Sequence, residues 1–163
     1  MLCHSTNLSF LFYEKGGRGI NIEPDPELHA ALVRHRPGDL NLNIGIGPEA
    51  GALNFHRMDN RSLSTFSATE AARLVNEEGV ALKDRLTIPV RRVRDVLDEH
   101  GFHPDFLSLD VEGTELAILQ AYDWERHRPG VICVETVGYS RRGDKAREVE
   151  TRDFLRARGY SEA

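Results

Sequence analysis

The sequence is poor in cysteine and in long apolar runs, and each shortage excludes a class of protein. The 163 residues include two cysteines, Cys3 and Cys133, which lie too far apart to indicate a disulfide framework or a zinc site. This usage fits a reducing compartment, and we expect a cytoplasmic protein. No apolar run approaches the ~20 residues of a membrane span. The first residues also lack the charged region and the long apolar core of a signal peptide.

An excess of basic residues is absent as well. The chain carries 21 Lys and Arg against 26 Asp and Glu, a formal net charge of −5, which argues against binding to nucleic acid through phosphate contacts. The charged fraction of 29% and the hydrophobic fraction of 40% are typical of globular proteins. A chain of 163 residues is long enough for one domain with a core and too short for two. We therefore expect residues 1–163 to form a single domain.

Apolar runs that alternate with amphipathic segments predict an α/β fold with a mainly parallel sheet. The predicted strands are 18–23, 40–46, 86–90, 106–109 and 129–135, and the predicted helices are 8–14, 26–35, 67–78, 91–100, a helix from 114 and 144–158. Residues 52–56 are expected to pair with 40–46 as a hairpin, and residues 58–65 to form an exposed polar loop. Pro89 indicates an edge strand, because proline cannot donate to a ladder. Cys133, inside an apolar strand, is expected in the core.

Acidic residues end three of these strands. Glu23, Asp110 and Glu135 each follow an apolar run, and Glu112 lies two residues after Asp110. One acidic strand end is most simply a solvated residue, but three favour a ligand site, because ligands bind at the carboxyl ends of parallel strands. Glu23 is suitably placed to accept hydrogen bonds from both hydroxyls of a ribose.

Several motifs that would define other chemistry are missing. The sequence has no P-loop, no His-Glu-x-x-His motif and no nucleophile elbow. Gly16, Gly17 and Gly19 precede a strand instead of following one, so we interpret them as a turn. His100 and His103 are interpreted as solvated loop residues, because Gly101 breaks any helix between them. No metal site is predicted.

Four segments resemble one known family. The stretches L-F-Y-E-K-G-G-R-G (11–19), R-G-I-N-I-E-P-D-P (18–26), D-F-L-S-L-D-V-E-G-T-E-L (105–116) and P-G-V-I-C-V-E (129–135) are similar in order and spacing to the FkbM family of S-adenosylmethionine-dependent methyltransferases. The resemblance implies a Rossmann-like methyltransferase fold with helices flanking the sheet. It also implies S-adenosylmethionine as the cofactor.

The resemblance assigns roles to particular residues. Glu23 would hold the cofactor ribose, and Asn43, Ile44 and Gly45 would border the adenine. Asp110 would face the methionine end and the methyl group, and we assign Asp110 and Glu112 to catalysis. For Glu112 and Glu115, acceptor binding, base catalysis and shaping of the helix start all remain open. The purely structural interpretation of Glu115 is an acidic residue that the helix dipole favours in the first turn. Thr114 is expected to cap this helix.

The chain departs from the family at its ends. The family's first strand and glycine-rich loop are missing before Asn7, and its final strands are missing after Gly159. We therefore expect an incomplete domain that binds S-adenosylmethionine weakly or not at all. The predicted activity is O-methylation of a hydroxyl on a sugar or other small metabolite. The alternatives are an inactive methyltransferase-like domain that folds or binds a partner, and a nucleotide-binding oxidoreductase, which the acidic motif fits less well.

Overall fold

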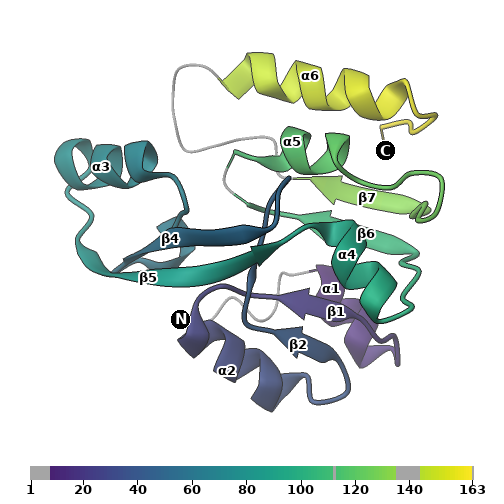
Figure 1. The fold of residues 1–163 in the computed structure, drawn as a ribbon, viewed down its shortest axis with the longest axis horizontal. Helices are drawn as coiled ribbons and strands as arrows, with labels where there is room; N and C mark the ends of the chain where they lie inside the picture. Colours follow the sequence, from purple (N-terminus) through teal and green to yellow (C-terminus); the bar gives the residue numbers. More distant parts are fainter. Residues whose placement is uncertain (1–7, 112, 135–143, 163) are drawn as a thin grey trace. The chain divides into compact units, whose positions relative to one another are not determined.

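The computed structural model describes residues 8–111, 113–134 and 144–162 (Figure 1). Two of the acidic residues singled out above, Glu112 and Glu135, lie outside these ranges. The chain divides into two compact units. The first comprises residues 1–45 and 51–90, and the second comprises residues 46–50 and 91–163.

A βαβ unit follows the first helix, α1 (Leu8–Glu14). Strands β1 (Ile20–Ile22) and β2 (Leu40–Leu42) pair in parallel, and helix α2 (Pro26–His35) connects them and contacts β2 (Figure 1). The predicted helix bounds 8–14 and 26–35 are confirmed. Helix α2 begins where it does because the Asp25 side chain accepts hydrogen bonds from two backbone N–H groups of its first turn, and because proline suits that turn.

A three-stranded sheet forms from β3 (Gly45–Ile46), β4 (Gly51–Met58) and β5 (Leu82–Arg91), in the order β3-β5-β4. The predicted hairpin partner was wrong, since β4 pairs antiparallel with β5 from Gly51↔Val90 onward. The predicted edge position of β5 was also wrong, because β5 lies in the middle. Proline is excluded from a central strand only at positions where a backbone N–H must donate to a neighbouring strand. Because β3 is only two residues long, few positions of β5 have to donate to it, and Pro89 is tolerated.

The segment expected to be an exposed loop is largely structured. It contains a short 3-10 helix, η1 (Arg61–Leu63), and ends at Thr65, which bridges His56 on β4. Met58 is 0% exposed, because it packs with Ala71 and Leu74 on helix α3 (Ala68–Glu77). The apolar side of α3 therefore covers the end of β4, and the prediction failed because the partner of Met58 lies in a distant segment.

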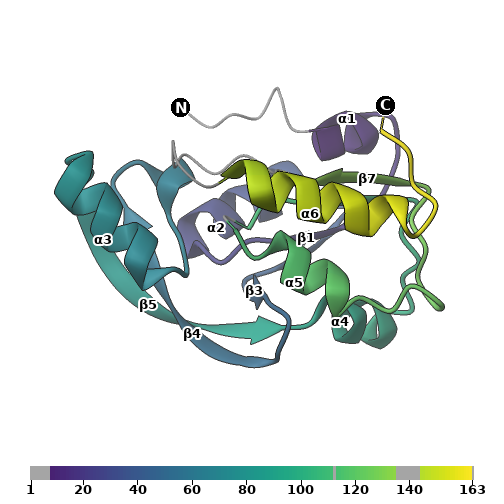
Figure 2. The ribbon, with the colours of Figure 1, turned by 90° about the horizontal axis from the view of Figure 1, so that it is seen from above.

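The second unit contains helix α4 (Val93–Glu99), strand β6 (Phe106–Leu109), helix α5 (Glu115–Gln120), strand β7 (Val131–Val134) and helix α6 (Asp144–Arg156). Strands β6 and β7 pair in parallel with Phe106 opposite Val131. Helices α5 and α6 contact one another and lie on the same side of this pair (Figures 1 and 2). The predicted central strand and the helix after it are confirmed.

Cys133 is exposed, which corrects its predicted core position. Alternate residues of β7 are exposed, and Val131 reaches 59%. An apolar run predicts a strand from composition alone, but burial of both faces requires covering elements. In the described residues β7 pairs with β6 only.

The described strands form three small sheets, two of them parallel pairs and one with an antiparallel pair. The α/β class is confirmed, and a continuous Rossmann-like parallel sheet stays a prediction. Among the helices of the described residues, none has the length and apolar character to cross a membrane. No group of three potential metal-ligating side chains occurs within the same residues.

Candidate functional site

Glu23 lies directly after β1, at the carboxyl end of the parallel β1–β2 pair. Its N–H donates to the Leu42 carbonyl at 3.0 Å, which extends the β1–β2 ladder by one residue. Its carboxylate oxygen Oε1 accepts a hydrogen bond from the Asp25 N–H at 2.8 Å. The turn of the E-P-D-P segment therefore holds the Glu23 side chain close to its own backbone.

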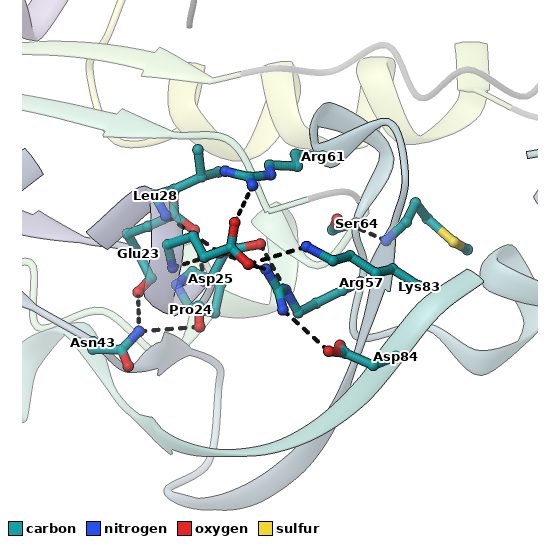
Figure 3. Close-up of polar contacts among 12 residues, drawn as sticks. Glu23, Pro24, Asp25, Leu28, Asn43, Arg57, Arg61, Ser64, Lys83 and Asp84 are labelled. Atoms are coloured by element: carbon teal, nitrogen blue, oxygen red, sulfur yellow. Dashed lines mark hydrogen bonds and ion pairs between the residues drawn. The ribbon is translucent and has the colours of Figure 1, made fainter. Parts of the chain in front are cut away.

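Asn43 joins this turn from the end of β2. Its side-chain amide donates to the Glu23 carbonyl at 2.8 Å and to the Pro24 carbonyl at 3.1 Å (Figure 3). The structure thus brings two sequence-predicted residues, Glu23 and Asn43, together at one strand edge. Because the amide donors of Asn43 bind backbone, its side chain shapes the turn. The same bonds end β2 at Leu42, which divides the predicted strand 40–46 in two.

Gly45 is required by packing in the first unit. A Cβ added to Gly45 would lie 2.6 Å from the Phe66 ring and 3.1 Å from Val90. Any side chain here would have to displace the aromatic ring. Ile44, the residue between Asn43 and Gly45, is partly buried. The backbone at Gly45 therefore packs directly against Phe66 and Val90.

Asp25 and Arg57 form an ion pair that sequence reasoning missed. Both residues are buried, with exposed fractions of 1% and 5%. The Arg57 guanidinium on β4 donates to Asp25 through Nε at 2.9 Å and through Nη2 at 3.3 Å. The position of Asp25 directly before a proline-initiated helix could have pointed to a cap, which the sequence analysis did not consider, but its arginine partner lies 32 residues away and could not be recognised locally.

Further charges surround Arg57 (Figure 3). It also donates to Glu27 at 2.8 Å and to Asp84 at 3.1 Å. Lys83 and Arg61 bind the same Glu27 carboxylate. The hydrogen bond from Arg57, followed by that from Lys83, lowers the pKa of Glu27 from 4.5 to about 2. Glu27 therefore stays ionised well into the acid range and completes a charged network beside the start of α2.

Asp110 directly follows β6 and is exposed, whereas Leu109 before it is 5% exposed. The predicted position of Asp110 at the end of a strand is confirmed, but the prediction that this strand is buried was wrong, since Leu109 is its one buried residue and Ser108 is exposed. It belongs to the second unit and Glu23 to the first, so a shared site for the two residues stays a prediction of the family resemblance. Glu112, the other predicted catalytic residue, lies outside the described residues.

Glu115 shapes the turn after Asp110. It is 8% exposed, and its Oε1 accepts hydrogen bonds from the Val111 N–H at 3.2 Å and the Gly113 N–H at 3.1 Å. Gly113 has a positive φ of 103°, which confirms the predicted turn. Thr114 occupies the cap position but makes no side-chain cap bond, so the predicted Thr114 cap was wrong. Of the open roles for Glu115, shaping of the helix start is the one these contacts support.

The model of the methyltransferase FkbM domain matches residues 4–162, which defines the class of protein as a methyltransferase. The chain belongs to the FkbM methyltransferase domain family. No curated protein and no solved structure matches the chain.

Proposed function

We propose that this methyltransferase uses S-adenosylmethionine and transfers its methyl group to a hydroxyl of a sugar or another small metabolite. The observation that carries the proposal is the Glu23 carboxylate, fixed at the carboxyl end of a parallel strand pair in a chain of this family. Strand ends of this kind are where α/β folds bind nucleotides, and a carboxylate there accepts the ribose hydroxyls.

The residues fit an adenosine group. A carboxylate can accept more than one hydrogen bond at a time, and Glu23 accepts one of them from the Asp25 N–H. The turn at residues 43–45 follows the neighbouring strand, and because the Asn43 amide is bound to backbone, contacts to the adenine would come from the main chain and from Ile44. In this proposal Asp110 lies toward the methionine end, and Glu112 takes part in acceptor binding or proton removal.

Methyl transfer depends on alignment of the acceptor with the methyl group more than on covalent catalysis by the protein. When bound, the cofactor supplies an electrophilic methyl group on a sulfonium. The protein's own tasks are to align the acceptor oxygen in line with that methyl and to take the hydroxyl proton. Asp110 is an exposed carboxylate at the carboxyl end of β6, so it suits either task. The balance of acidic over basic residues argues against a nucleic-acid acceptor. A cytoplasmic location belongs to the same proposal, since two distant cysteines fit a reducing compartment.

A titration with S-adenosylhomocysteine tests the proposal. Ligand is added to millimolar concentration and backbone amide signals are followed. Glu23→Ala should weaken binding by at least about tenfold, because hydrogen bonds to a charged acceptor contribute about 1.5–3 kcal/mol each. Glu77→Ala, an exposed acid on α3, is the matched control and should leave the affinity unchanged. Absence of binding, or equal affinity of wild type and Glu23→Ala, would contradict the proposal.

A further inference from the structure

Asp25 connects three parts of the first unit. Its Oδ1 accepts hydrogen bonds from the Glu27 and Leu28 N–H groups at 2.8 and 3.2 Å, which start helix α2. Its carboxylate also receives two hydrogen bonds from Arg57 on β4. Its own N–H donates to Glu23 Oε1 at 2.8 Å. The orientation of the Glu23 carboxylate thus depends on the backbone of a residue whose side chain is fixed from two sides.

Arg57 is the partner of Asp25 that lies far from it in the sequence, on β4. Its Nε and Nη2 bind the two oxygens of Asp25, and this planar, two-point contact fixes the carboxylate in direction as well as position. Asp84 and Glu27 hold the guanidinium in turn, through Nη1 at 3.1 Å and Nη2 at 2.8 Å. A buried carboxylate that loses such a partner is strongly destabilised and must move toward water or another donor.

We infer that Arg57 is a positioning residue for cofactor binding: through Asp25 it holds the Glu23 carboxylate in the orientation that receives the ribose hydroxyls. The inference rests on the proposed function of Glu23. Loss of the two-point contact lets Asp25 shift, and its N–H bond to Glu23 transmits the shift. Preorganisation of the carboxylate is then lost, and the ordering cost falls on ligand binding.

The first experiment measures the link itself and needs no ligand. Arg57→Lys keeps the charge but cannot reproduce the two-point contact. The control is Arg73→Lys on α3, whose guanidinium binds Glu70 through two nitrogens and also Glu78 but has no contact to Asp25 or Glu23 among those described. Hydrogen exchange of the Asp25 amide, which donates to Glu23, reports whether that bond opens.

The Asp25 amide should exchange at least about tenfold faster in Arg57→Lys than in wild type, relative to the Leu74 amide in the core. In Arg73→Lys this ratio should stay at the wild-type value. If Arg57→Lys does not fold, Asp84→Asn removes only the half-exposed outer partner of Arg57 and should raise the same ratio about two- to threefold. An unchanged ratio in a folded Arg57→Lys or Asp84→Asn protein would overturn the inference.

The second experiment measures ribose dependence. Affinities for S-adenosylhomocysteine and for its 2′,3′-dideoxy analogue, the deoxy form that lacks both ribose hydroxyls, are compared in wild type, Arg57→Lys and Arg73→Lys. Wild type and Arg73→Lys should prefer the ribose form, and in Arg57→Lys the preference should fall at least about threefold while affinity for the deoxy form is kept. Equal weakening of both ligands would mean that Arg57 only stabilises the fold, which overturns the inference and leaves the proposed function standing. A wild type that does not bind or discriminate would overturn the role of Glu23 and this inference together.

Discussion

At the scale of single residues, the proposed role of the second unit in methyl transfer falls on one carboxylate. Asp110 is exposed and directly follows Leu109, which is buried in β6. The end of β6 thus presents a charged group to solvent, and the exposed Asp110 side chain contributes nothing to the core. Loss of its charge should therefore affect function and leave stability intact.

We predict that Asp110→Asn lowers methyl transfer by at least about tenfold, the scale of a lost acid–base or aligning group. The melting temperature should change by less than about 2 °C, as for other surface substitutions. Transfer of a labelled methyl group from S-adenosylmethionine to a panel of sugars and hydroxylated metabolites measures the first quantity. Glu125→Gln, another exposed acid of this unit, is the control. Normal transfer by folded Asp110→Asn would remove Asp110 from catalysis.

At the scale of elements, a side chain of helix α5 stabilises the connection between β6 and α5. Glu115 reaches back from the first turn of α5 and accepts two backbone N–H groups of the preceding turn with one oxygen. The turn that follows Asp110 is therefore specified by α5 as much as by the positive φ of Gly113. Strand, turn and helix form one locally supported segment.

Glu115→Ala should destabilise the protein by about 2 kcal/mol and lower its melting temperature by about 4–8 °C, because the Val111 and Gly113 N–H groups lose a charged acceptor. Glu115→Gln keeps a side-chain oxygen and should lose less than half as much. Thermal unfolding of both variants measures the difference. Equal losses in the two variants would instead indicate that the negative charge at the helix start is what matters.

At the scale of the whole molecule, arginine–carboxylate pairs set the response to acid. Arg57 and Lys83 hold the pKa of Glu27 at about 2. Arg73 lowers the pKa of Glu70, and Arg92 lowers that of Asp95. Because these carboxyl groups bind protons more weakly in the folded state, the unfolded state takes up more protons as the pH falls. Their contribution to stability is present above the ordinary carboxyl pKa and is lost in acid.

We predict that the melting temperature declines as the pH falls from about 4.5 toward 2, the interval between the ordinary and the folded pKa of Glu27. Burial, followed by the charge of Arg85, lowers the pKa of His56, so a smaller decline should begin below pH 6.5. In Glu27→Gln the acid decline should be shallower, and added salt should weaken it. Thermal unfolding from pH 7 to pH 2 measures both slopes. Identical slopes in wild type and Glu27→Gln would contradict the prediction.

The sequence by itself determined the local elements and the strand-end positions of the predicted site. Helix α2 could be predicted to the residue because its start and end signals are adjacent in the chain. Glu23 and Asp110 could be placed at strand ends because an apolar run followed by an acid is also a local pattern. The family was recognisable for the same reason, since its motifs are contiguous.

Tertiary structure alone decided which segments meet. Three features depend on contacts between segments that are distant in the sequence, so no local pattern could predict them. They are the pairing of β4 with β5, the burial of Met58 and the exposure of Cys133. The ion pair of Asp25 with Arg57 joins side chains 32 residues apart. Such contacts form because a buried charge must be paired and apolar side chains are more stable when they are removed from water. Which residue becomes the partner depends on the three-dimensional fold of the chain.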